Sequence, residues 1–231
     1  MLGPTDYVLW FINFSIEVFA LVCVFKTRAF ARYFTIALYL CSALAFEIGR
    51  YVILQSFGYT SNTYFYFYFY SEFLVTILLY FVLMGLYAQA FPDMGVSKYL
   101  RGGTMLLLAG TALVSYLMVA ALSDRLVTRF VIELSRNLDF VGVLLTYLLW
   151  GTMVKMKENR TRLMQLVLSL GVYFSAFAAS YALVNLYPDF GLWRYVSHLM
   201  SMWLPLSWAY TFVKVPEDAR TATISVVVPS R

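Results

Sequence analysis

Eight ionisable side chains stand inside long apolar stretches of the sequence. A charge at membrane depth is costly, so such groups normally face a bundle interior or a wet cavity and often bind ligands, protons or ions. The eight residues are Glu17, Glu47, Arg50, Glu72, Glu133, Arg136, Asp139 and His198. They are therefore the first candidates for function.

Three pairs of these residues stand three positions apart, which places both side chains on one face of an α-helix. The pairs are Glu47 with Arg50, Glu133 with Arg136, and Arg136 with Asp139. Taken singly, each pair is explained by a structural ion pair. Across the whole set, however, five carboxylates face two arginines. This excess predicts a protonated acid, a shared proton or a bound cation.

Glu17 is the most isolated of the acids. It stands near the middle of its apolar stretch, and Asn13 lies one helical turn earlier on the same face. We expect Glu17 to be a neutral acid or a proton or cation site, and Asp139 is the second candidate for that role. His198 is the only histidine; we interpret it as a satisfied interior side chain, with a pH-sensing or ligand-binding role as the alternative.

Known catalytic and cofactor motifs are missing from the sequence. A single histidine excludes bis-histidine haem ligation within the chain, the H-E-x-x-H zinc motif and the Glu-x-x-His pairs of di-iron bundles. The Gly-x-Ser-x-Gly signature and a phosphate-binding glycine loop are also absent. We therefore expect no enzymatic activity, no metal and no cofactor.

An alternating run of Tyr and Phe occupies residues 64–70 and is followed by Ser71 and Glu72. We predict a helix here, because the apolar stretch continues far beyond the run. An interfacial aromatic belt explains the rings; alternatively, they form with Glu72 a recess suited to a cation. A second local feature is Pro205, which lacks a backbone N–H and predicts a kink or a hinge in the last helix.

Composition places these residues in a membrane. Of the 231 residues, 62% are hydrophobic and only 13% are charged, whereas soluble domains have roughly 45–50% and 25%. Long apolar stretches predict an all-α, seven-helix bundle with one membrane domain, residues 1–214. The predicted spans are about 7–25, 33–57, 64–91, 102–122, 130–154, 163–187 and 194–214. The start carries no basic residue, so we expect the first helix to be retained rather than cleaved.

The basic residues predict the orientation. Twelve Lys and Arg residues stand at one side of the predicted spans and three at the other, and the richer side is normally cytoplasmic. This places the N-terminus outside and the short, disordered tail 215–231 in the cytoplasm. Because insertion explains the net charge of +5, we expect no nucleic-acid partner. Cys23 and Cys41 are expected to be small buried side chains without a disulfide.

Two sequence motifs and the end of the chain resemble those of a known group of proteins. They are Tyr-Phe-Tyr-Phe-Tyr-Phe-Tyr-Ser-Glu at 64–72, Glu-Leu-Ser-Arg-Asn-Leu-Asp at 133–139, and a short Pro-Glu exit after the last span. Over most of its length the chain resembles an uncharacterised family of small bacterial seven-helix membrane proteins. The resemblance implies a multi-pass protein of the bacterial inner membrane. It implies no activity.

Depth within the predicted spans leads to the functional hypothesis. At about 1.5 Å of rise per residue, nearly all the ionisable groups fall in the outer half or near the midplane. We therefore expect a sensor- or receptor-like bundle that binds a small ligand or cation in an outward-facing polar recess, built from Glu47, Arg50, Glu72, Glu133, Arg136, Asp139 and His198. The alternatives are a proton- or cation-coupled transporter and a structural subunit with membrane or cytoplasmic protein partners.

Overall fold

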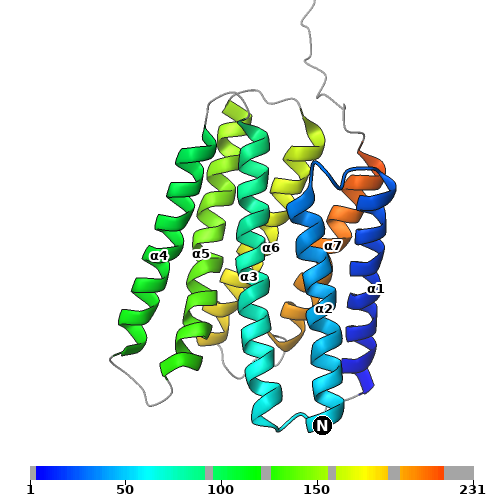
Figure 1. Cartoon of the computed structure of the whole chain (residues 1–231), viewed down its shortest axis with the longest axis vertical. Helices are drawn as coiled ribbons and strands as arrows, with labels where there is room; N and C mark the ends of the chain where they lie inside the picture. The colour runs from blue at the N-terminus through cyan, green and yellow to red at the C-terminus, as the bar shows by residue number, and fades with distance from the viewer. Residues whose placement is uncertain (1–3, 92–95, 121–125, 156–159, 187–192, 216–231) are drawn as a thin grey trace, which may run out of the picture.

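The computed structural model describes residues 4–91, 96–120, 126–155, 160–186 and 193–215, and within them the chain is helical with no sheet. Each predicted span is a helix (Figure 1). The helices are α1 Pro4–Lys26, α2 Phe34–Phe57, α3 Asn62–Ala90, α4 Val96–Ala120, α5 Leu126–Lys155, α6 Thr161–Leu186 and α7 Trp193–Lys214. The all-helical fold is thus confirmed.

Five helices are long and apolar enough to cross a membrane within the described residues. Their apolar segments are Tyr7–Lys26, Phe34–Phe57, Asn62–Ala90, Arg129–Lys155 and Thr161–Val184. The chain is accordingly a multi-pass membrane protein, while the count of seven spans stays a prediction. In α4 the apolar segment is shorter, Leu106–Leu117. That helix begins at Val96 rather than at the predicted Gly102, because Lys98 and Arg101 suit a helix but not hydrocarbon.

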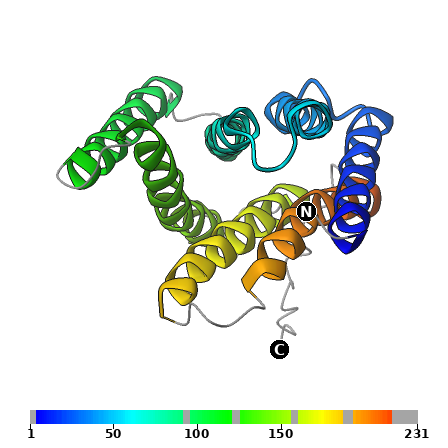
Figure 2. The ribbon, with the colours of Figure 1, turned by 90° about the horizontal axis from the view of Figure 1, so that it is seen from below.

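Six of the helices close into a ring, and α4 lies outside it. Neighbours around the ring follow the order α1, α2, α3, α5, α6, α7 and back to α1 (Figure 2). Helix α4 packs against α5 and, less extensively, against α3. A hydrogen bond of 2.9 Å from Asn137 Nδ2 in α5 to Ser115 Oγ in α4 fixes this contact. Only ring helices can therefore contribute to a central site.

The outward surface of the bundle is apolar. Phe11, Phe19 and Val22 on α1 and Leu106 and Leu117 on α4 are each more than half exposed. So much exposed apolar surface is unfavourable in water and favourable against lipid tails. Cys23 is buried as predicted, but Cys41 is exposed on α2, so its predicted burial is wrong. Both thiols are free.

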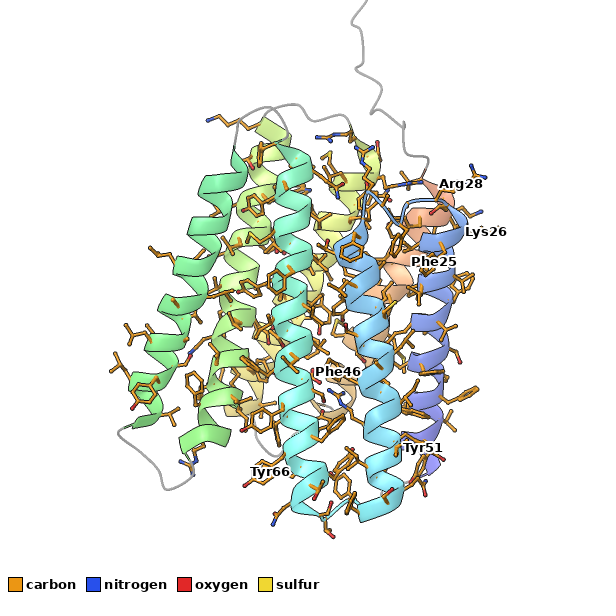
Figure 3. All side chains as sticks on the ribbon, viewed as in Figure 1. Phe25, Lys26, Arg28, Phe46, Tyr51 and Tyr66 are labelled. Carbon is orange, nitrogen blue, oxygen red and sulfur yellow. The ribbon has the colours of Figure 1, made fainter. Side chains whose placement is uncertain are left out.

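The two ends of the bundle differ in chemistry. Lys26 and Arg28 mark one end, here called the basic end, whereas Tyr51 and Tyr66 lie toward the other, here called the aromatic end (Figure 3). The basic end also carries Arg32, Lys155, Arg162 and Lys214. Near it the interior contains buried apolar side chains such as Val24, Ile36, Leu83 and Leu166. A cavity of about 550 Å³ also lies at this end, with Arg28, Arg32, Arg162, Phe212 and Lys214 among its lining residues. A larger cavity lies toward the aromatic end.

The connection after α1 depends on one residue in the left-handed region. Arg28 has a φ of 54°, and the amides of Arg28 and Ala29 donate to the carbonyls of Phe25 at 3.0 Å and Val24 at 3.2 Å. These two bonds form a Schellman-type helix end, a position where glycine is usual. The chain is thereby reversed into α2.

Candidate functional site

A cavity of about 670 Å³ lies inside the ring toward the aromatic end. Side chains of α1, α2, α3, α5, α6 and α7 line it, together with Tyr59 of the α2–α3 turn. Its polar lining residues are Asn13, Glu47, Arg50, Glu72, Ser135, Arg136 and Ser201. Its aromatic lining residues are Tyr7, Trp10, Tyr51, Tyr59, Tyr64, Phe65, Tyr68, Phe69, Phe177 and Tyr181. We call this space the aromatic cavity.

The turn before α3 sets the direction of the aromatic run. Gly58 has a φ of 78°, which a glycine adopts without steric cost. Ser61 caps α3, because its Oγ accepts a hydrogen bond of 3.1 Å from the Tyr64 amide. The predicted helix over residues 64–70 is confirmed.

Tyr and Phe alternate at every second position of this run. Residues four positions apart are neighbours on an α-helix, so each Tyr lies beside a Tyr and each Phe beside a Phe. The ring centroids of Tyr64 and Tyr68 are 6.3 Å apart, and those of Phe65 and Phe69 are 4.6 Å apart. These four rings line the cavity, whereas Tyr66 does not and points away from the bundle (Figure 3). The run thus supplies both a cavity wall and outward-facing rings.

Arg50 has its strongest partner on a neighbouring helix. Its Nη2 lies 2.8 Å from Glu72 Oε2, and its Nε donates a 2.8 Å hydrogen bond to Ser71 Oγ. The guanidinium carbon is 4.7 Å from the centre of the Tyr68 ring. Glu47, the partner predicted from spacing, is 3.9 Å away, so that pair is the weaker one.

Glu47 keeps unused hydrogen-bonding capacity. Its neighbours in the cavity lining include Trp10, whose ring stacks on Tyr51 with centroids 5.2 Å apart. The second oxygen, Glu47 Oε2, is buried without a hydrogen-bond partner among the described residues. A buried acceptor left in this state costs free energy that a donor would recover.

Arg136 forms the second charged group of the cavity. Its Nη1 lies 3.2 Å from Glu133 Oε1, and its guanidinium carbon is 5.2 Å from the centre of the Tyr181 ring. The predicted pair of Arg136 with Glu133 is thus confirmed, whereas the predicted pair with Asp139 is not formed in the described part of the chain. Asp139 is 4% exposed and does not line the cavity.

Glu17 lies one turn deeper than the cavity wall in α1. Its carboxyl is 7% exposed, and Oε1 accepts a 3.1 Å hydrogen bond from Asn13 Nδ2. The predicted placement of these two residues on one helix face is thus confirmed. Glu17 Oε2 and Asn13 Oδ1 have no partner among the described residues. Asn13 lines the cavity, so it connects the cavity with the buried acid.

The structure brings together four of the predicted recess residues, Glu47, Arg50, Glu72 and Arg136. Of the others, Glu133 joins them only through Arg136, Asp139 is buried outside the lining, and the His198 side chain lies outside the described residues. Pro205 is buried within α7, and its hinge role stays a prediction. In the described ranges no three His, Cys, Asp or Glu side chains gather to hold a metal ion.

Several lining residues were not predicted from the sequence. Tyr68 is not one of them, because the alternative interpretation of the aromatic run already placed its rings in a recess with Glu72. Trp10, Tyr181 and Phe177 carry no such signal, because aromatic residues make up 19% of the chain and occur in every helix.

Compared with known protein families, curated proteins and solved structures, the chain matches none.

Proposed function

We propose that this chain is a sensor- or receptor-like bundle that binds a small ligand or cation in the aromatic cavity. The main support for this proposal is the cavity itself. It has the size of a small-molecule site, and aromatic walls surround a few converging polar groups, the usual composition of such sites. The Glu47 oxygen without a partner adds a reason for a ligand to bind there.

The proposed topology has seven spans with the cavity open to the outside. The basic residues at the opposite end support this orientation, because positive charge is retained on the cytoplasmic side during insertion. The resemblance noted from residues 64–72 and 133–139 supports a bacterial inner membrane.

Orientation is tested with single cysteines in a variant whose native cysteines are replaced, Cys23→Ala and Cys41→Ala. Asn62→Cys is at the aromatic end and Lys26→Cys is at the basic end. A membrane-impermeant maleimide should label intact cells at position 62 and reach position 26 only after lysis. The reverse labelling pattern would refute the orientation.

Ligand binding is tested by thermal unfolding of the purified chain in nanodiscs with a panel of small amines, carboxylates, alcohols and alkali cations. At least one compound should raise the unfolding temperature of the native chain. Glu72→Gln, which removes a charge from the cavity lining, should reduce that rise. Asn137→Leu is the control, since it breaks a polar contact outside the ring. A panel without any effect on the native chain would count against the function.

A second function, a proton- or cation-coupled transporter, is favoured by Glu17. Its carboxyl is buried in α1, has one oxygen without a partner, and is linked to the cavity through Asn13. Ionisable groups in such positions serve as proton sites in transporters. Proteoliposomes should then show pH-dependent flux that Glu17→Gln abolishes. Flux that survives this substitution would exclude Glu17 as the coupling site.

A further inference from the structure

We propose that the aromatic cavity binds a primary ammonium compound with an apolar or aromatic body. The ammonium N–H groups of this ligand would donate hydrogen bonds to Glu47 and Asn13. This inference rests on the proposed function and narrows it to one ligand class. Four observations support it: two acceptors without partners, their common depth, the charge of the lining and the lining rings over which no arginine lies.

The two acceptors are Glu47 Oε2 and Asn13 Oδ1. Neither has a hydrogen-bond partner among the described residues, and both side chains line the cavity. Asn13 is only 6% exposed, and its side-chain amide donates a hydrogen bond to Glu17. Its carbonyl oxygen is therefore the atom that can accept a hydrogen bond from a ligand. Buried acceptors of this kind call for a donor.

Both acceptors lie at the same depth on neighbouring antiparallel helices. The stacked rings of Trp10 and Tyr51 join α1 to α2 near the aromatic end, 5.2 Å apart. Asn13 follows Trp10 by three residues and Glu47 precedes Tyr51 by four. Each acceptor is therefore about 5 Å deeper than this stacked pair. The two acceptors thus lie at one level of the cavity wall on adjacent helices.

An ammonium group fits these acceptors better than other head groups. It supplies three N–H donors and a positive charge, so it can bond the carboxylate and the amide oxygen together. A hydroxyl supplies a single donor, and a quaternary ammonium supplies none.

The charge of the lining also favours a cation. Glu72 forms an ion pair with Arg50 at 2.8 Å, whereas the Glu47 carboxylate is 3.9 Å from the same guanidinium. Arg136 is neutralised by Glu133 at 3.2 Å. Glu47 is thus the carboxylate whose charge is least compensated within the lining.

The aromatic walls complete the recognition. The two arginines of the lining already sit over Tyr68 and Tyr181, at 4.7 Å and 5.2 Å. Arene faces bind cations and pack against apolar bodies. Among the remaining rings, Trp10 and Tyr51 are on the same two helices as the acceptors. A volume of about 670 Å³ accommodates a body the size of a phenyl ring with a short chain.

Isothermal titration of the chain in nanodiscs tests the ligand class with five related probes. They are phenethylamine, its N,N,N-trimethyl derivative, phenethyl alcohol, 3-phenylpropionate and phenylalanine. Phenethylamine should bind at least about tenfold more tightly than the trimethyl, alcohol and carboxylate probes, because each of these lacks the donors or the charge. Phenylalanine should bind through its ammonium group. Asn137→Leu, which breaks a polar contact outside the ring, should leave the phenethylamine affinity unchanged.

Glu47→Gln should weaken phenethylamine binding by about tenfold or more, the loss expected for one charge-assisted hydrogen bond. Glu47→Asp keeps the charge and should retain most of the affinity, which controls for misfolding. If the alcohol or carboxylate probe binds as tightly as the amine, or if Glu47→Gln binds the amine unchanged, the ammonium inference is wrong while the cavity remains a binding site. If no probe and no compound of the wider panel binds, the proposed function itself fails.

Discussion

The carboxylate of Glu72 in α3 and the guanidinium of Arg50 in α2 form the shortest ion pair in the described part of the chain, at 2.8 Å. The pair spans two helices, and the Tyr68 ring lies 4.7 Å from the centre of the same guanidinium. It thus holds Arg50 at the cavity wall rather than along its own helix, where Glu47 is farther away.

Removal of Arg50 should destabilise the bundle and leave Glu72 without its cation. Side-chain exposure is 15% for Arg50 and 38% for Glu72, so solvent screens part of the interaction. We expect Arg50→Gln to lower the free energy of unfolding by about 2 kcal/mol. Denaturant titration in mixed micelles, for both single variants and the double variant with Glu72→Gln, measures the coupling. Strictly additive losses would show that the two side chains do not interact.

Gly142 should not tolerate alanine. A Cβ at this position would lie 2.8 Å from the Phe174 ring, which is fully buried and packs edge-on against Tyr80. We expect Gly142→Ala to cost about 1–3 kcal/mol of stability through this overlap. Gly151→Ala in the same helix is the matched control, because nothing lies within 4 Å of its Cβ. Thermal unfolding should leave the control unchanged, and equal losses in both variants would contradict the explanation.

Two tyrosines join α3 to α5 through their hydroxyls. Tyr80 donates to the Leu138 carbonyl, and Tyr87 donates to the Leu145 carbonyl at 2.7 Å. Since interhelical hydrogen bonds in membranes contribute roughly 0.5–1.5 kcal/mol each, Tyr80→Phe and Tyr87→Phe should lower stability by such amounts. Tyr70→Phe, which alters an exposed ring, serves as the control. Hydrogen exchange of α3 and α5 amides provides the readout, and unchanged protection in both variants would argue against the two bonds.

Replacement of Arg28 by glycine should stabilise the protein through its effect on the backbone. Its φ of 54° places a side chain in the left-handed region, which costs a non-glycine residue about 1 kcal/mol. Arg28→Gly should therefore unfold at a higher temperature than Arg28→Ala, which loses the same charge but keeps the Cβ. Comparison of these two variants isolates the backbone effect. A lower unfolding temperature for the glycine variant would disprove it.

Local interactions in this protein were predictable from the sequence. Apolar stretches of sufficient length specify helices, because lipid leaves backbone groups no partner outside the helix. The same reasoning identified residues 64–70 as helical despite their strand-like alternation. The placement of Asn13 and Glu17 on one helix face followed from their spacing on one turn, which needs no knowledge of the neighbouring helices.

Contacts between helices were decided by the tertiary structure alone. Arg50 lies 2.8 Å from Glu72 of α3 but 3.9 Å from Glu47 of its own helix, and the Arg136 guanidinium lies over the Tyr181 ring of α6. The physical reason is the membrane itself. In water, an apolar stripe marks the face of a helix that turns inward, but in lipid the outward faces are apolar as well. Side-chain packing therefore decides how each helix is rotated and which of its polar groups reach the aromatic cavity.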